Sequence, residues 1–240
     1  MNIEASSTRR LTTKVSGSEP TIALVSWSGG KDSCLALWRA QCAGTRIELL
    51  ITAMDEAGEK SRSHGIPPAL LQAQADALGA PLAFYGTSWK TYEEKFIGML
   101  AGARARGIDA AIFGDIDLVP HREWEEKVCG AAGLAATLPL WGEPRRKLVD
   151  EFLGAGFRAV VVCVNGNWLG PEFVGREFDA AFLADLPPGV DACGENGEFH
   201  TFVYDGPAFR HPVAFTRTRV ETYQSPPELG GATYYFQSLI

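Results

Sequence analysis

The segment Ser28-Gly29-Gly30-Lys31-Asp32-Ser33 lies between an apolar run, Ile22 to Val25, and a helical pattern that begins at Cys34. A strand that passes through paired glycines into a helix leaves the N–H groups of the turn and of the first helical turn unpaired and pointing in one direction. Such N–H groups bind phosphate. We therefore expect the fold to be organised around a phosphate site at residues 28–33.

The spacing of this segment excludes two other glycine-rich phosphate loops. The P-loop requires GxxxxGK followed by Ser or Thr, whereas here Asp32 follows Lys31 and no glycine lies five residues before Gly30. The dinucleotide fingerprint GxGxxG is also missing from this turn. Two interpretations remain. The segment resembles the pyrophosphate loop of ATP pyrophosphatases, or it is a Ser/Gly turn with an Asp/Ser helix cap.

Length and composition are those of a globular protein with ample material for a core. The chain has 240 residues, 46% hydrophobic and 21% charged, which fits one large domain or one domain with a small appendage. The net charge of -7 disfavours nucleic acid as a partner. No run reaches the roughly 18 apolar residues of a membrane span, and no secretory signal is visible. We expect a cytoplasmic protein with no membrane partner.

The five cysteines form no CxxC pair. Their odd number and their spacing argue against a disulfide framework and against the usual zinc or iron-sulfur sites. We expect reduced thiols, with Cys34, Cys129 and Cys163 buried in apolar segments.

The apolar segments predict strands that alternate with helices as far as about residue 165. We expect strands at residues 21–27, 47–54, 82–85, 110–113, 138–140 and 157–164. We expect helices at residues 34–44, 67–79, 92–106, 121–132, 148–153 and 172–183. This alternation implies an α/β fold, an open parallel sheet with flanking helices and right-handed crossovers.

Composition changes along the chain predict three parts. Residues 1–20, rich in Ser, Thr and Arg, are expected to be a mobile tail, followed by a nucleotide-binding domain at 21–165. Three late segments alternate like strands, at 199–204, 213–220 and 233–239. Residues 166–240 are therefore expected to hold a helix and a small antiparallel β appendage.

The end of the fourth expected strand is a candidate for the opposite side of the same ligand site. Ligands of open parallel sheets bind beyond the carboxyl ends of the strands, where the winding direction reverses. If the first strand lies beside the fourth, as in the fold that the loop resembles, Gly114 and Asp115 face residues 28–33 across that crevice.

A late acidic motif surrounds Asn196-Gly197, the dipeptide that most strongly predicts a tight hairpin. In such a hairpin Glu195 and Glu198 flank the turn and lie close together. Like charges facing across a strand pair are unfavourable, which suggests a shared cation or a cationic ligand group. The alternative is that both carboxylates extend into water. His200 is likewise either a hydrogen-bonded structural residue or a catalyst.

Several motifs together resemble the diphthine-ammonia ligase family, N-type ATP pyrophosphatases of the PP-loop superfamily. The resemblance covers roughly residues 21 to 210, and its most specific element is GENGEFHTF at 194–202. The motifs are SGGKDS at 28–33, FGDI at 113–116 with His121, Arg122 and Trp124, PLW at 139–141, CGENGEFHT at 193–201 and DGP at 205–207.

The resemblance implies a Rossmann-like fold of the adenine nucleotide alpha hydrolase type and an ATP-dependent, amide-forming ligase. Family members use ATP, with Mg²⁺, and ammonia to amidate the carboxylate of diphthine on translation elongation factor 2, with release of AMP and pyrophosphate. The acceptor of this chain is then elongation factor 2 or an unknown carboxylate. A homodimer remains an open alternative for its assembly.

Residue roles follow from the resemblance together with the chemistry. The ATP site is expected to comprise Ser28, Gly29, Gly30, Lys31, Asp32, Ser33, Ala53, Met54, His64, Gly114 and Asp115. Catalytic roles are expected of Lys31, Asp32, Glu195 and Glu198, and acceptor binding of Glu195, Asn196, Glu198 and His200. Lys31 would neutralise the departing pyrophosphate, and Asp32 would hold Mg²⁺ or brace the loop. Glu195 and Glu198 would position or deprotonate ammonium.

Two rival functions share the phosphate loop. A tRNA-modifying enzyme of the PP-loop type usually needs cysteine pairs or a basic binding domain, and the missing CxxC and the charge of -7 disfavour it. A module that senses ATP or AMP without turnover is the other alternative. Lys31, Asp32 and the GENGE carboxylates favour an enzyme.

Overall fold

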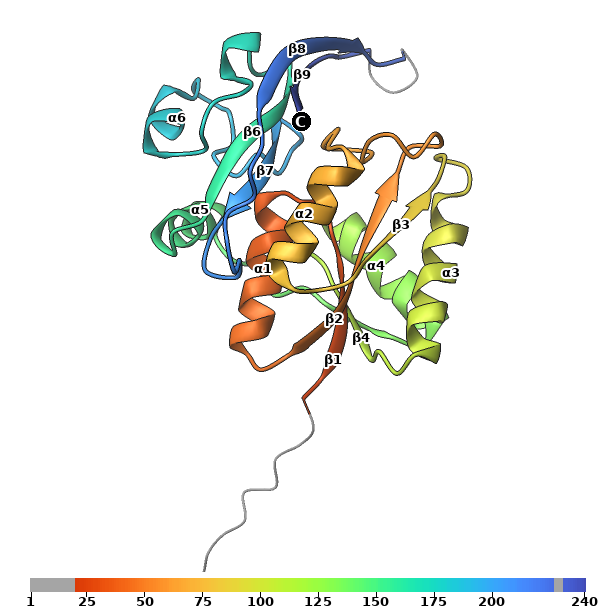
Figure 1. Cartoon of the computed structure of the whole chain (residues 1–240). Coiled ribbons are helices and arrows are strands. Elements are labelled where there is room, and N and C mark those ends of the chain that lie inside the picture. The colour runs from red at the N-terminus through yellow and green to blue at the C-terminus, as the bar shows by residue number, and fades with distance from the viewer. Residues whose placement is uncertain (1–19, 227–230) are drawn as a thin grey trace, which may run out of the picture.

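A computed structural model describes residues 20–226 and 231–240 and places them in two sheets (Figure 1). The first sheet is parallel, with the order β3-β2-β1-β4-β5. Its strands are β1 (Ile22–Ser26), β2 (Arg46–Met54), β3 (Leu82–Gly86), β4 (Ala110–Ile112) and β5 (Ala135–Thr137). The tail predicted at 1–20 lies outside the described residues, apart from Pro20.

Helices cover both faces of the parallel sheet. They are α1 (Lys31–Cys42), α2 (Pro68–Leu78), α3 (Tyr92–Ala105) and α4 (Val119–Ala132). The strand β1 shows why both faces need cover, because Ala23 and Val25 belong to the core beneath α1 and α2 whereas Leu24 belongs to the core beneath α3 and α4. The continuously apolar first strand was therefore correctly interpreted as buried on both sides.

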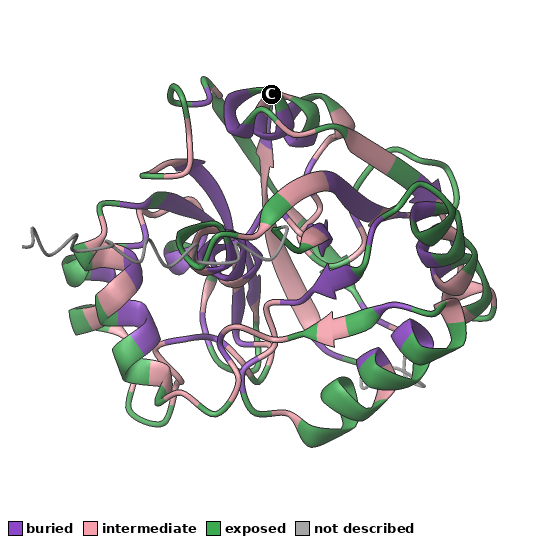
Figure 2. Cartoon of the chain, turned by 90° about the horizontal axis from the view of Figure 1, so that it is seen from below, coloured by how far each residue is buried: buried purple, intermediate pink, exposed green. Residues whose placement is uncertain are grey.

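The second sheet is antiparallel, with the order β7-β6-β9-β8, and lies over α1 and α2 (Figure 1). Its strands are β6 (Arg158–Asn165), β7 (Phe199–Asp205), β8 (Arg217–Gln224) and β9 (Thr233–Leu239). The remaining helices are α5 (Arg145–Gly154), a 3-10 turn (Pro171–Phe173) and α6 (Ala180–Asp185). The core beneath α1 and α2 continues into this sheet, and Figure 2 shows buried residues on the strands and on the inner sides of the helices.

The strand β6 differs from the prediction, because it was expected to be a further parallel strand of the first sheet. It pairs antiparallel with both β7 and β9. A run such as Val160 to Val164 is typical of any strand covered on both faces, so its composition cannot distinguish the two sheets. The domain boundary expected at residue 165 falls at the end of β6, inside the second sheet.

Other predicted elements were wrong or shifted for local reasons. Residues 138–140 form a turn in which Trp141 N donates to Leu138 O (3.1 Å), and the strand lies before it, at β5. The helix expected at 172–183 is replaced by a segment running beside β6, where Val161 N donates to Arg176 O (2.8 Å), and then by α6. The strand predicted at residues 213–220 is shifted along the chain and is observed as β8, at Arg217–Gln224.

The start of α1 also differs, because the helix begins three residues before Cys34. The N–H of Cys34 already donates to Gly30 O (3.1 Å), so residues 31–33 of the phosphate segment form the first turn of the helix. Lys31 and Asp32 are thereby held by helical geometry.

The predicted neighbours β1 and β4 are confirmed, with Ala23 opposite Ala110. The order β3-β2-β1-β4-β5 reverses its winding between these two strands, and their carboxyl ends open the crevice in which such sheets bind ligands. Within the described residues, none of the helices has the length and apolar character needed to cross a bilayer.

Candidate active site

The segment 28–33 is held by contacts from both sheets. Gly29 O accepts from Val203 N (3.0 Å) and from Gln74 Nε2 (2.9 Å), and Lys31 N donates to Thr201 Oγ1 (3.0 Å). Gln74 Nε2 also donates to Val203 O (2.6 Å). The strand β7 and the helix α2 therefore fix the loop that leaves β1.

The expectation that all the turn amides are free was wrong for two of them. Gly30 N donates to Ser28 Oγ (3.2 Å), and Lys31 N is taken by Thr201. Ser28 Oγ in turn lies 3.0 Å from Ser33 Oγ. The hydroxyl groups of the loop thus help to brace it as well as lining the cavity.

Gly29 is required by its backbone angle and by its surroundings. Its φ is 80°, and a Cβ at this position would lie 2.7 Å from Gln74 Oε1. We expect Gly29→Ala to lower the free energy of unfolding by about 1–3 kcal/mol, measured by urea denaturation. Gly44→Ala is the matched control, since Gly44 has a φ of 87° with open space around it. Equal losses in the two variants would contradict a packing role for Gly29.

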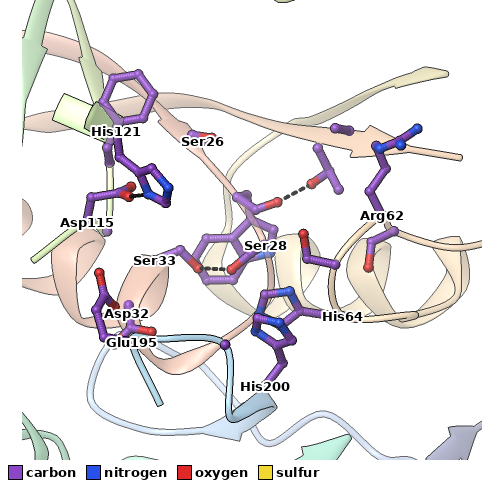
Figure 3. Close-up of a pocket in the computed structure, with 18 of the residues that line it drawn as sticks. Ser26, Ser28, Asp32, Ser33, Arg62, His64, Asp115, His121, Glu195 and His200 are labelled. Carbon is purple, nitrogen blue, oxygen red and sulfur yellow. Dashed lines mark hydrogen bonds and ion pairs between the residues drawn. The ribbon is translucent and has the colours of Figure 1, made fainter. Parts of the chain in front are cut away.

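A cavity of about 710 Å³ opens at the carboxyl ends of β1, β2 and β4. The loop, the β2–α2 connection, the β4–α4 connection and the motif at 193–201 all contribute to it (Figure 3). Of the predicted site residues, it is lined by Ser28, Lys31, Asp32, Ser33, Ala53, His64, Gly114, Asp115, Glu195, Asn196 and His200. The structure therefore brings the phosphate loop and the late acidic motif to one cavity.

Four predicted site residues do not line this cavity. Gly29 and Gly30 belong to the loop but are packed against neighbouring side chains, so that a Cβ on Gly30 would lie 2.5 Å from His64 Nε2. Met54 is buried in the core beneath the loop, and Glu198 is fully buried. Direct contact of Met54 or Glu198 with a ligand in this cavity is therefore not supported.

The acidic motif does not form the predicted hairpin, because the strand that precedes β7 and pairs with it is β6, which ends at Asn165, so Asn196-Gly197 does not join two paired strands in a tight turn. Instead, the Glu198 carboxylate organises the loop from within. It accepts from the backbone N–H of Asp191 (3.2 Å) and of Asn196 (2.9 Å), and from Asn196 Nδ2 (2.9 Å). This arrangement separates the two glutamates, with Glu195 in the cavity and Glu198 beneath the loop.

Lys31 is a buried cation paired with its neighbour. Its Nζ donates to both carboxylate oxygens of Asp32, at 2.7 and 2.9 Å. Burial favours the neutral amine, yet the Asp32 carboxylate holds the pKa of Lys31 above its ordinary value. Burial also raises the pKa of Asp32. Lys31 therefore stays charged at the mouth of the phosphate loop.

Glu195 lies beside Asp32 in Figure 3, and its Oε1 accepts from Ile116 N (3.4 Å). Burial, followed by the nearby Asp32 carboxylate, raises the pKa of Glu195 to about 7. A carboxylate with this pKa can accept and release a proton near neutral pH, as a general base must.

His64 and His200 were expected at different subsites, but the structure places their rings in contact, with their planes inclined at 39°. Their ring centroids are 4.5 Å apart, and the two rings lie beside the phosphate loop (Figure 3). Burial lowers the pKa of both imidazoles, that of His200 to about 4. Both rings are therefore neutral at neutral pH.

Sequence reasoning missed further residues of the same cavity. His121 Nδ1 lies 2.7 Å from Asp115 Oδ1, and Glu125 follows one helical turn after His121 on α4. The four-residue spacing of His121 and Glu125, just after Asp115, was a signal that could have identified this group. The guanidinium carbon of Arg62 lies 4.3 Å from the ring centroid of Trp89, and both residues line the cavity.

The side chains of the cavity show whether it could hold Mg²⁺. No group of three His, Cys, Asp or Glu side chains is placed to hold a metal within residues 20–226 and 231–240. Mg²⁺ in nucleotide sites is usually held by one or two carboxylates and by substrate phosphates, so such a cluster is not required. Asp32 supplies a partly exposed carboxylate in the cavity, which fits one ligand of this kind.

Sequence comparison decides the family. The sequence profile of the diphthamide synthase N-terminal domain matches residues 21–136, and that of the diphthamide synthase C-terminal domain matches residues 144–225. The chain belongs to the diphthamide synthase family. The resemblance noted from the motifs at 28–33 and 193–201 is thereby confirmed.

Relatives in the diphthamide synthase family carry the name diphthine-ammonia ligase. The protein of Bos taurus is 24% identical over 82% of this chain and 84% of its own length, and that of Danio rerio 26% over 80% and 85%. A solved structure from Methanocaldococcus jannaschii, described as a predicted subunit of tRNA methyltransferase, is 20% identical. It covers 59% of this chain and 80% of its own with a TM-score of 0.42, an overlap too loose to bear on function.

Proposed function

We propose that this member of the diphthamide synthase family is an ATP-dependent, amide-forming ligase. In the first step an acceptor carboxylate attacks the α-phosphate of ATP and pyrophosphate leaves. In the second step ammonia displaces AMP from the acyl-adenylate. The observation that carries this proposal is the meeting of the loop bearing Lys31 and the motif bearing Glu195 in one cavity.

The phosphate loop supports the first step. Negative charge grows on pyrophosphate as it leaves, and Lys31 is a permanently charged donor at that place. The Ser28 and Ser33 hydroxyl groups offer further hydrogen bonds. Asp32 would hold Mg²⁺, which neutralises the phosphates when bound. Ala53 and His64 are proposed to contact the nucleoside.

The acidic motif supports the second step. Ammonia must lose a proton as its nitrogen bonds to the acyl carbon, and Glu195 can take that proton because the pKa of its carboxyl is about 7. Glu198 is proposed to act indirectly, by holding the loop that carries Glu195. The family relatives named diphthine-ammonia ligase favour diphthine on elongation factor 2 as the acceptor. An unknown carboxylate remains the alternative.

The products of the nucleotide identify the reaction class. We expect ATP labelled in the adenine ring to yield labelled AMP in the presence of ammonium and of elongation factor 2 that carries diphthine, measured by thin-layer chromatography. Omitting either co-substrate is the control, because the sustained reaction needs both. Accumulation of ADP would contradict the proposal. Tight ATP binding without turnover under any acceptor would favour a nucleotide sensor, and AMP formation stimulated only by tRNA would favour the tRNA-modifying alternative.

A further inference from the structure

Glu125 is a buried acid that the residue roles above do not use. It lies on α4, lines the active-site cavity and is 3% exposed. Its Oε2 has no hydrogen-bond partner among the described residues. Burying a polar atom without a hydrogen-bond partner destabilises the folded state, and in native proteins such an atom often marks a site for a bound ligand, ion or water.

The surroundings of Glu125 show which ligand would suit that oxygen. The Asp115 carboxylate is paired with His121 Nδ1 (2.7 Å) and is near enough to the Glu125 carboxyl to raise its pKa, while Glu125 Oε2 has no hydrogen-bond partner among the described residues. The rings of Tyr92 and Trp124, with centroids 5.6 Å apart, also line the cavity. Carboxyl oxygens accept N–H bonds, and aromatic faces attract nitrogen cations. The group therefore fits a small N–H donor.

We propose, on the basis of the function proposed above, that Glu125 Oε2 holds the ammonia that attacks the acyl-adenylate. The ligand is the smallest N–H donor, free ammonia or ammonium. The negative charge of Asp115 disfavours ionisation of the Glu125 carboxyl, and His121 holds Asp115 in place.

The protonation of Glu125 would supply nitrogen in its reactive form. Burial and the Asp115 carboxylate raise the pKa of Glu125 to about 10, so the acid is neutral when the site is free. An ammonium ion beside a carboxylate and an ammonia molecule beside a carboxylic acid differ only in where one proton lies. A buried, weakly polar site favours the uncharged pair. The nitrogen lone pair is then available.

The chemical step balances with groups already in the cavity. The nitrogen lone pair forms the C–N bond, the bond from the acyl carbon to the AMP oxygen breaks, and AMP leaves with that electron pair. The excess proton on nitrogen passes to the Glu195 carboxylate. Glu195 is close enough to Glu125 for its charge to contribute to the raised pKa of Glu125.

The first test measures binding without an acceptor. Ammonium chloride should raise the thermal unfolding midpoint of the full chain above that in sodium chloride at the same ionic strength, because a ligand of the native state stabilises it. Glu125→Met should lose this shift, because methionine has no oxygen that accepts an N–H. Glu126→Gln is the matched control, because Glu126 is an exposed neighbour paired with Arg122. Tetramethylammonium, which has no N–H, should give no shift.

The second test measures turnover with elongation factor 2 that carries diphthine. Glu125→Met should raise the KM for ammonium by about tenfold or more and leave ATP–pyrophosphate exchange within about twofold of the wild type. Glu125→Gln has the shape of the neutral acid and keeps one acceptor oxygen, so it should retain the ammonium shift and a KM within about twofold of the wild type. Loss of both in a folded Gln variant would contradict binding by the neutral acid.

The outcomes separate this inference from the proposed function. An unchanged ammonium shift and KM in the folded Glu125→Met variant would overturn the role of Glu125. A shift with tetramethylammonium equal to that with ammonium would also overturn it, because the site would then be a cage for a bulky cation. Absence of exchange in the wild type would defeat the proposed function, whereas the binding test would still judge the ammonia site.

Discussion

Lys31→Met is expected to slow ATP–pyrophosphate exchange and AMP formation by about a hundredfold or more, in line with the loss of a preorganised donor to a developing anion. The reason is that Lys31 is a buried cation held at the phosphate loop by Asp32. The measurement is exchange of labelled pyrophosphate into ATP at saturating ATP and acceptor. A rate within a few-fold of the wild type would remove Lys31 from the reaction.

A matched lysine controls for the loss of charge. Lys147 is exposed and pairs with Glu143 one helical turn away. Lys147→Met should leave the exchange rate unchanged, because exposed pairs of this kind contribute little to stability and lie outside the cavity. Thermal unfolding of both variants distinguishes lost chemistry from lost folding, since Lys31→Met also leaves the Asp32 carboxylate without its cation.

Glu195→Gln is expected to reduce amide formation by about 10²–10⁴-fold and to flatten the acidic side of the pH profile. Glu195 accepts a proton only when it is ionised, and the pKa of its carboxyl is about 7. The wild-type rate should therefore fall as the pH drops below 7 and level off above it. The glutamine variant has no such group, so its residual rate should not follow that curve.

The pH experiment has its own control and its own way to fail. Glu172 is exposed on the 3-10 turn and does not line the cavity, so Glu172→Gln should keep the wild-type profile. A variant at Glu195 that keeps the same acidic limb would assign that limb to another group. ATP–pyrophosphate exchange should survive the substitution at Glu195, because adenylation precedes the arrival of ammonia.

The parallel half of the fold was predictable because its signals are local. The apolar run at 22–25, the glycines at 29 and 30 and the spacing of the later strands each report on their own segment. The adjacency of β1 and β4 was reached through the fold that the loop resembles, and the structure confirms it. The partners of β6 were not predictable, because an apolar strand covered on both faces reads alike in parallel and antiparallel sheets.

The residues of the candidate site were likewise predictable only where their sequence signal is local. The loop residues were found because their spacing is diagnostic, whereas the tight hairpin inferred from Asn196-Gly197 was wrong. That dipeptide predicts a hairpin only when strands flank it, and here the buried Glu198 carboxylate gathers the loop amides instead. Glu125 was missed because its significance depends on burial and on Asp115, which lies ten residues earlier.

The bonds that join Gly29 and Lys31 to Val203 and Thr201 have a consequence for protein engineering. A fragment that ends before β6 would contain every residue of the SGGKDS motif. It would lack β7, the strand whose Val203 and Thr201 hold the motif in place. In chimaeras that take the parallel sheet from one relative and the antiparallel sheet from another, ATP binding should survive only when the contacts between the loop and β7 are preserved. We therefore expect substitutions in β7 to alter nucleotide affinity as well as substitutions in the loop itself.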